Sequence, residues 1–377
     1  MEYVLSKVIL LARHSLRTPL LNVGDICKEC SSKCSRDGHL TEAGKNDAFL
    51  MGRYLREYLT RNHLLSNECS LPSAREFLLC HSPSERAGRT TECFIKGMVL
   101  PAVPEAEIGK LITAEEDVFS TSLKFCDSNH RVKIEKCIKT AVEEKISLLN
   151  DNISFLESVQ KRVGFNRSYD LGNYRIKLEN NKGPKLDGDF SDASRLCDSF
   201  IHCHLIEDGF LHDLKTEDWK QLSAICDVHR AVLYGNEKIA VNAAHSLLDA
   251  VKKEMSDSER FFSYFCGHDS NIHAFLSAIG VQEYSLSETA FGAIPSGCIC
   301  FFEVFKGAFS DTFFRLSMLY RSDAYYSSGP GISVAQYVCS QPLSINQLNR
   351  DEDGLYRLSD FLSLVSEKMS PGNMLDY

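Results

Sequence analysis

The sequence predicts an α/β fold in which a mostly parallel central sheet is flanked by helices and a second, mainly helical domain is inserted into the chain. Two observations lead to this prediction. Short apolar runs typical of buried strands lie toward both ends of the chain, whereas segments with helical periodicity fill the middle. We therefore assign residues 1–104 and 256–377 to one α/β core and residues 105–255 to a helical insertion.

The expected strands are short apolar runs, which in chain order are Val8–Ala12, Phe77–Cys80, Phe261–Cys266, Cys298–Phe305 and Phe313–Tyr320. The first helix is expected to begin at Thr41, because threonine is a good N-cap residue and Glu42 follows it. A second helix follows the second apolar run directly, from about Ser84 to Met98. In the middle of the chain the helical periodicity covers Ile134–Val159 and Trp219–Leu233.

Charge and composition limit the classes of partner. The 377 residues are 44% hydrophobic and 25% charged, which is typical of a globular domain, and the formal net charge is −9. This balance makes nucleic acid and anionic membrane surfaces poor partners. No apolar run approaches the length of a transmembrane helix, and Val8–Ala12 is too short for the core of a signal peptide. Nothing in the sequence indicates an oligomeric state.

The 15 cysteines form an odd, dispersed set, which favours a reducing compartment. We therefore expect a cytoplasmic protein, or a periplasmic or secreted one if a leader has been removed. The only dense group is Cys27, Cys30 and Cys34, with His39 as the nearest additional ligand for zinc. Three thiols without a clear partner pair favour the alternative, which is a polar surface loop with at most one disulfide.

Charged side chains follow three of the predicted strands at the point where each strand ends. Arg13 and His14 end the first apolar run, Arg86 lies in the first turn of the helix after the second, and His268 and Asp269 follow the third. Ligands of open α/β sheets bind outside the carboxyl ends of the strands, and parallel strands bring these ends to one edge. The sequence therefore predicts that these side chains form one site.

The residue types suit the chemistry of phosphate esters. Arg13, Arg17 and Arg86 can each bind phosphate oxygens through paired N–H donors, and helix N-termini add further donors. A neutral imidazole can attack phosphorus, and a carboxylic acid can protonate the leaving oxygen and then activate water. The set does not resemble a metal cage, and arginines can neutralise charge as Mg²⁺ does elsewhere. We therefore expect no cofactor, no metal, and a small phosphate monoester as the partner.

A family resemblance appears at these residues. Arg13–Pro19 resembles the RHGxRxP motif of the histidine acid phosphatases, and Gly267–Ile272 resembles their distal HD motif. Gly38–Gly44 resembles the family's GxLTxxG segment, and Glu85–Thr90 resembles the region that carries its third phosphate-binding arginine. The chain resembles this family, branch 2 of the histidine phosphatase superfamily, over nearly its whole length. It is most similar to the bacterial glucose-1-phosphatase and phytase branch.

The resemblance implies a role for each site residue. His14 would be the nucleophile, Asp269 the proton donor, and the phosphate ligands would be Arg13, Arg17, Arg86 and His268. Relatives also place an acidic residue at the mouth of the substrate pocket, for which Glu207 is the candidate. The alternative is that Glu207 and Asp208 form an ordinary solvated pair.

Two positions depart from the family pattern. Ser15 stands where most members have glycine. Cys339 corresponds to the first half of a family disulfide, but Tyr356 occupies the second position, so we expect this disulfide to be absent.

The resemblance implies metal-independent hydrolysis of phosphate monoesters through a phosphohistidine, with a sugar phosphate such as glucose 1-phosphate, an inositol phosphate, or both as substrates. The alternatives are a phosphomutase of the same superfamily and a non-catalytic module that binds a phosphorylated ligand. The insertion would build the pocket walls that select the substrate.

Overall fold

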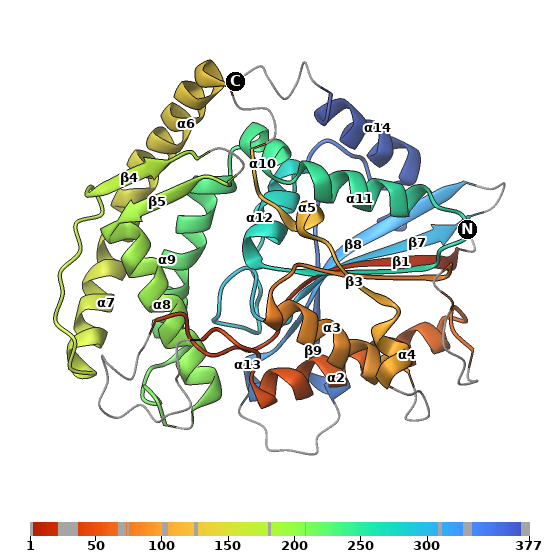
Figure 1. Ribbon diagram of the computed structural model, residues 1–377, viewed down its shortest axis with the longest axis horizontal. Coiled ribbons are helices and arrows are strands. Elements are labelled where there is room, and N and C mark those ends of the chain that lie inside the picture. The colour runs from red at the N-terminus through yellow and green to blue at the C-terminus, as the bar shows by residue number, and fades with distance from the viewer. Residues whose placement is uncertain are drawn as a thin grey trace.

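A single large sheet organises the molecule. The computed structural model describes residues 3–21, 37–66, 73, 75–99, 105–123, 127–179, 182–207, 209–307, 311–326 and 334–370. The sheet has eight strands in the order β10-β8-β7-β1-β6-β2-β3, and β9 also pairs with β8 (Figure 1). The strands are β1 (Val4–Arg13), β2 (Phe77–His81), β3 (Ile112–Ala114), β6 (Phe262–Gly267), β7 (Ile299–Lys306), β8 (Thr312–Arg321), β9 (Val338–Pro342) and β10 (Tyr356–Arg357).

The sheet has a parallel half and an antiparallel half. Strands β1, β6, β2 and β3 pair in parallel, whereas β7, β8, β9 and β10 join through antiparallel pairs. The α/β fold class is confirmed, and the sheet is mixed, which corrects the expectation of a mostly parallel one. The connection from Lys306 to Thr312 is too short for a crossover, so β7 and β8 form an antiparallel pair.

The register of the parallel half brings the predicted strand ends together. Arg13 pairs with Gly267, and His81 pairs with Cys266, so β1, β2 and β6 end at the same edge. Along β1 the buried side chains alternate between two cores. Ile9 and Leu11 belong to one hydrophobic cluster and Val8 and Leu10 to the other, and all four are fully buried.

Helices cover both faces of the sheet (Figure 1). On one face lie α2 (Glu42–Arg61) and α3 (Glu85–Met98), and on the other lie α11 (His245–Ser256), α12 (Asp269–Ala278) and α14 (Leu358–Lys368). Thr41 caps α2 as predicted, because its hydroxyl accepts from the N–H of Gly44 at 3.0 Å. The pair α2 and α3 packs closely through glycine, since a Cβ on Gly97 would lie 1.9 Å from the carbonyl oxygen of Phe49.

The central part of the chain is mainly helical. It contains α4 (Glu105–Gly109), α5 (Glu116–Phe119), α6 (Ser128–Ile146), α7 (Asn150–Arg162), α8 (Asp189–Ile206), α9 (Thr216–Tyr234), α10 (Glu237–Ala243) and the hairpin of β4 (Tyr174–Lys177) and β5 (Lys185–Gly188). The segment with helical periodicity over Ile134–Val159 is two helices, separated by a 3-10 turn at Ser147–Leu149. Helices α6 to α9 gather beside the sheet (Figure 1), while β3 joins the sheet itself. The assignment of 105–255 as a separate domain stays a prediction.

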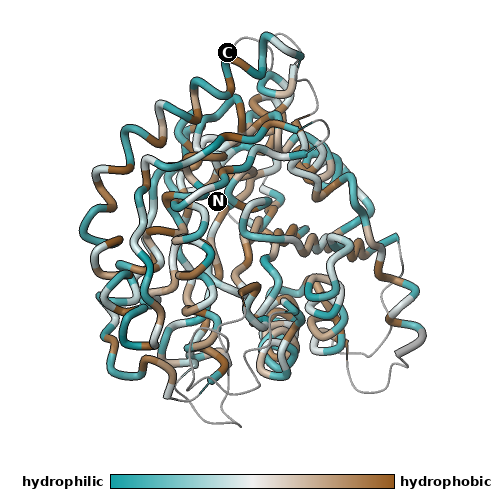
Figure 2. Tube along the Cα trace, turned by 60° about the vertical axis from the view of Figure 1, so that its left-hand side comes forward, coloured by the Kyte–Doolittle hydropathy of each residue, from teal (hydrophilic) through white to brown (hydrophobic). Residues whose placement is uncertain are grey.

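The distribution of hydrophobic residues follows this layout. Figure 2 shows hydrophobic residues recurring along segments inside the molecule, whereas hydrophobic and hydrophilic residues alternate along the outer helices. Cys339, on β9, carries a free thiol. None of the helices within the described part of the chain is both long and apolar enough to span a membrane.

Candidate active site

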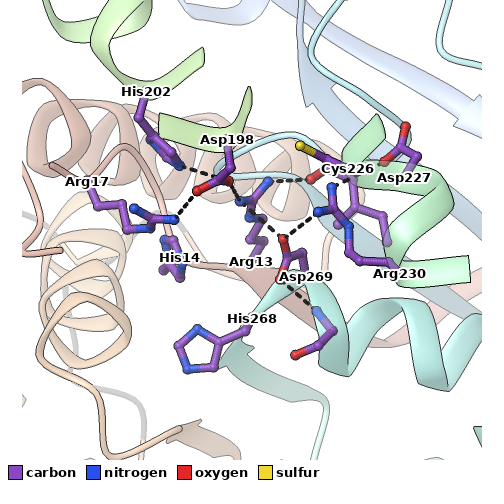
Figure 3. Close-up of polar contacts among 12 residues, drawn as sticks. Arg13, His14, Arg17, Asp198, His202, Cys226, Asp227, Arg230, His268 and Asp269 are labelled. Atoms are coloured by element: carbon purple, nitrogen blue, oxygen red, sulfur yellow. Dashed lines mark hydrogen bonds and ion pairs between the residues drawn. The ribbon is translucent and has the colours of Figure 1, made fainter. Parts of the chain in front are cut away.

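The structure brings together the six predicted site residues, of which Figure 3 labels Arg13, His14, Arg17, His268 and Asp269. The rings of His14 and His268 lie edge to face, with their centroids 5.4 Å apart. Arg86 Nη2 lies 3.4 Å from His268 Nδ1, and Arg13 Nη2 lies 3.4 Å from Asp269 Oδ2. Arg17 joins the group because it and Arg13 contact the same carboxylate, described below. The sequence-based grouping of these residues at one edge of the sheet therefore agrees with the observed geometry.

His14 is held as a neutral imidazole with a defined tautomer. Its side chain is buried, and its Nδ1 lies 2.9 Å from the carbonyl oxygen of Ser15. Because a carbonyl oxygen only accepts, Nδ1 must carry the proton, which leaves the lone pair on Nε2. Burial lowers the pKa of His14 well below its usual value, and the nearby His268 and Arg13 lower it further. The imidazole is therefore uncharged, with its free lone pair on Nε2.

The three predicted phosphate arginines carry buried donors without an acceptor. The Nε groups of Arg13, Arg17 and Arg86 are buried, and they have no hydrogen-bond partner among the described residues. Burial lowers the pKa of Arg86 to about 10, and the charges of Arg17 and Arg13 add to this effect. Unsatisfied buried donors are costly, so an anion with several oxygens would stabilise this arrangement.

His268 is held beside the arginines by hydrogen bonds to Arg86 and Ser82. Its Nδ1 accepts from Arg86, so its Nε2 carries the proton and donates to the hydroxyl of Ser82 at 3.1 Å. Burial lowers the pKa of His268 to about 4, with Arg86 contributing next. A neutral His268 fixes the direction of the Arg86 guanidinium.

Two acidic groups from the helical region enter the site, and the sequence did not indicate them. Asp198 on α8 binds Arg17 Nη2 at 2.7 Å and lies 3.7 Å from Arg13 and 3.8 Å from His202. Burial would raise the pKa of Asp198, but Arg17, His202 and Arg13 lower it to about 2. The only sequence signal was the i,i+4 spacing of Asp198 and His202, which places both on one helix face.

Asp227 and Arg230, both on α9, form a further ion pair at the site. Arg230 Nη2 lies 3.2 Å from Asp227 Oδ1, and Arg230 Nη1 lies 3.2 Å from Asp269 Oδ2 (Figure 3). The backbone N–H of Ala293 also donates to Asp227 Oδ2 at 3.0 Å. Arg230 was not predicted as a site residue, although the i,i+3 spacing of Asp227 and Arg230 is visible in the sequence.

Asp269 is an anion in this arrangement. It receives the N–H of Ser270 at 2.8 Å and contacts both Arg13 and Arg230. Burial would raise the pKa of Asp269, but the charges of Arg230 and then Arg13 hold it well below its usual range. A role as proton donor therefore requires an additional negative charge nearby.

A model of the family matches most of the chain. The family model of the histidine phosphatase superfamily (branch 2) matches residues 4–318 of the chain. The chain belongs to this superfamily. It is a phosphomonoesterase of the histidine acid phosphatase type, as the resemblance implied.

Individual relatives of this phosphatase agree with that assignment. A glucose-1-phosphatase of Providencia rettgeri is 24% identical over 308 residues, which cover 76% of this chain and 73% of that protein. The phytase from Citrobacter braakii has the same fold, with a TM-score of 0.83, 17% identity and coverage of 99% of both chains. A Hafnia alvei phytase in complex with myo-inositol hexakis sulphate has a TM-score of 0.83, 19% identity and coverage of 98% of both chains.

A pocket adjoins the charged cluster of this phosphatase. Its polar lining includes Arg13, Asp198 and Arg230, and its apolar lining includes Ile201, Leu205, Phe291 and Tyr326. Most of these side chains come from the helical region and the loops that face it. The walls of the pocket and the phosphate-binding edge thus come from different parts of the chain.

The remaining predicted residues lie elsewhere. Glu207 follows Ile206, the last residue of α8, and it is not among the residues that line the pocket beside Asp198. Its role stays a prediction. Cys27, Cys30 and Cys34 lie outside the described residues. Within the part of the chain that the structure describes, no group of three His, Cys, Asp or Glu residues is arranged to hold a metal ion.

Proposed function

We propose that this phosphatase hydrolyses phosphate monoesters through a phosphohistidine formed on His14. The observation that carries the proposal is the placement of a buried, neutral imidazole, with its lone pair on Nε2, within a group of arginines. In the first step Nε2 forms a bond to phosphorus while the bond from phosphorus to the ester oxygen breaks. In the second step water attacks phosphorus, His14 leaves, and inorganic phosphate is released.

The phosphoryl group binds to Arg13, Arg17 and Arg86, and His268 becomes an additional ligand when its Nε2–H turns from the Ser82 hydroxyl to a phosphate oxygen. The buried Nε donors of the three arginines support this assignment, because phosphate oxygens satisfy them. Binding also replaces carboxylates as arginine partners, since Arg13 and Arg17 contact Asp198 without substrate. The guanidinium charges stabilise the transferring group without Mg²⁺ or another cofactor.

Asp269 acts first as an acid and then as a base. The bound phosphoryl group brings negative charge beside Asp269 and competes for Arg13, and both effects favour the protonated carboxyl group. The proton moves to the departing ester oxygen, and the resulting carboxylate then accepts a proton from the attacking water.

We propose sugar phosphates or inositol phosphates as substrates. Support comes from the glucose-1-phosphatase of Providencia rettgeri and from the Hafnia alvei phytase in complex with myo-inositol hexakis sulphate. Apolar side chains beside the charged cluster, such as Phe291, offer surfaces against which the carbon face of a ring can pack. Glu207 remains the proposed acidic residue at the pocket mouth.

The function is tested by measuring phosphate release from p-nitrophenyl phosphate, glucose 1-phosphate and inositol hexakisphosphate in the presence of EDTA. We expect hydrolysis of the aryl ester and a difference in kcat/KM between the two natural esters. Transfer of the phosphoryl group to a second sugar without net release of phosphate would instead identify a phosphomutase.

The role of Asp269 is tested with two leaving groups. Asp269→Asn keeps the size of the side chain but cannot deliver a proton, so phosphorylation by glucose 1-phosphate should slow by about 10² to 10⁴-fold. The loss should be much smaller with p-nitrophenyl phosphate, because p-nitrophenolate leaves without protonation. Pre-steady-state kinetics measure the phosphorylation step for both substrates. Equal losses would show that another group supplies the proton.

The pH dependence tests the contact between Arg230 and Asp269. The reaction with glucose 1-phosphate needs protonated Asp269, so kcat/KM falls as pH rises through the pKa of that residue. Arg230 holds this pKa well below its usual range, so Arg230→Gln should raise it and move the fall in kcat/KM to higher pH. Arg13, His14 and His268 also act on Asp269. They are unchanged in Arg230→Gln, so the shift of the profile reports the loss of Arg230.

The pH profiles of the wild type and of Arg230→Gln, measured on glucose 1-phosphate, check this expectation. A profile that does not move would contradict the assignment of Arg230 as the main partner of Asp269.

A further inference from the structure

Each polar group of Ser15 makes one hydrogen bond, and one of these bonds holds the nucleophile. The carbonyl oxygen of Ser15 accepts from Nδ1 of His14 at 2.9 Å. The N–H of Ser15 donates to the hydroxyl of Thr90 at 3.1 Å, and the Ser15 hydroxyl donates to Asp47 Oδ2 at 2.6 Å. Ser15 is fully buried, so water does not compete for these bonds. Ser15 is therefore held through its N–H and its side chain, on either side of the Cα atom that precedes the carbonyl.

Asp47 is itself fixed by a buried arginine. Asp47, on α2, is 1% exposed, and its Oδ1 lies 2.9 Å from Nη2 of Arg321 at the end of β8. The same Nη2 also donates to the backbone carbonyl of Asp47 at 3.2 Å. The side chain of Arg321 has no exposed area. A chain of contacts thus runs from β8 through α2 to Ser15 and His14.

The backbone closes tightly over this chain of contacts. A Cβ on Gly297 would lie 2.7 Å from Asp47 Oδ2, and Gly297 has a φ of +72°. Its N–H donates to the carbonyl oxygen of His14 at 3.1 Å. Glycine at this position therefore allows the chain to cover the hydrogen bond between Ser15 and Asp47 and to hold the backbone of His14.

Stability alone is a weak explanation for a buried ion pair here. Removing two charges from water is costly, and apolar pairs of similar volume often stabilise a protein as well or better. The pair of Asp47 and Arg321 is, however, connected to the nucleophile through one residue. The hydroxyl of that residue donates to Asp47, and its carbonyl oxygen accepts from His14. That hydroxyl belongs to Ser15, at a position where glycine is usual in the resemblance described above.

We infer that Ser15, Asp47 and Arg321 form a buried positioning relay that sets the direction of His14 Nε2. The inference rests on the proposed function, because it takes His14 as the nucleophile. The hydroxyl of Ser15, held by Asp47, fixes the peptide whose carbonyl accepts from Nδ1. A fixed Nδ1–H keeps the imidazole plane and the Nε2 lone pair aligned with phosphorus.

The first test is Ser15→Ala. Loss of the hydroxyl should lower kcat by about tenfold to a hundredfold, which is the usual effect of removing a residue that orients a reacting group. Inhibition by inorganic phosphate should change little, because the phosphate arginines are untouched. Steady-state kinetics on p-nitrophenyl phosphate with phosphate as inhibitor measure both quantities.

The second test compares two double variants that share the loss of the arginine charge. Asp47→Asn with Arg321→Met keeps an oxygen that accepts from Ser15, whereas Asp47→Leu with Arg321→Met removes it. We expect the asparagine variant to keep a higher kcat than the leucine variant, because only asparagine still accepts from Ser15, and the leucine variant to match Ser15→Ala. Thermal unfolding of both variants accounts for any difference in stability.

Unchanged kcat in Ser15→Ala, or equal kcat values in the two double variants, would overturn the relay. A parallel loss of phosphate inhibition in Ser15→Ala would also overturn it, because the hydroxyl would then act on binding. Failure of the wild type to form a phosphohistidine is a separate result, which would overturn the proposed function and the relay together.

Discussion

His14→Ala is expected to reduce turnover by on the order of 10⁴-fold or more, because the neighbouring imidazole of His268 has its lone pair engaged with Arg86. His14 is 3% exposed, its lone pair is on Nε2, and the charges of Arg13, Arg86 and Arg17 act on its ring. The pKa of His14 is well below its usual value, so the wild-type imidazole stays neutral and nucleophilic under acidic conditions. The kinetics of phosphate release from p-nitrophenyl phosphate measure the loss directly.

The matched control for this variant is His212→Ala. His212 is exposed and lies outside the cluster, so its replacement should leave kcat unchanged. Inorganic phosphate should still bind to His14→Ala, since its ligands remain, and it should raise the midpoint of thermal unfolding. Substantial turnover by a folded His14→Ala protein would contradict the assignment of the nucleophile.

The second large effect concerns the phosphate arginines. Arg17→Ala and Arg86→Ala should each lower kcat/KM by about a hundredfold or more, which is the scale for loss of one preorganised donor. Arg17 also balances the charge of Asp198, so its loss leaves a carboxylate with fewer partners next to the phosphate. Inhibition by inorganic phosphate should weaken in parallel, because these contacts act in both the ground state and the transition state.

Arg89→Ala provides the control on the same helix as Arg86. Its side chain is 56% exposed and pairs with Glu92 at 2.7 Å, so kcat/KM should remain at the wild-type value. If Arg86→Ala left phosphate inhibition unchanged, Arg86 would not be a phosphate ligand, and its contact with His268 would have only a structural role.

The site at the sheet edge could be predicted because its signals are local in the sequence. Each apolar run of the parallel half is followed at once by charged residues, and the register of β1 with β6 and β2 turns these into neighbours. Strand direction was harder to predict. The runs that became β7 and β8 are almost entirely buried, so their hydrophobicity gives no direction, and only their short connection indicates an antiparallel pair.

The acidic and basic residues from α8 and α9 could not be predicted in the same way. Asp198 and Arg230 lie in helices whose charged residues are all exposed or half-buried, and such charges usually have no specific partner. Only the packing of these helices beside the strand ends brings Asp198 to Arg17 and Arg230 to Asp269. This placement depends on contacts between distant parts of the chain, which spacing within one helix does not determine.

The phosphohistidine on His14 can be captured directly. Wild-type enzyme is mixed with a radiolabelled phosphate ester, quenched within milliseconds in alkaline denaturant, where phosphohistidine persists, and digested for peptide analysis. We expect label on the peptide that contains His14, formed and lost at rates consistent with kcat. We expect no label in His14→Ala. Turnover by the wild type without labelled protein, or label on a residue other than His14, would contradict these expectations.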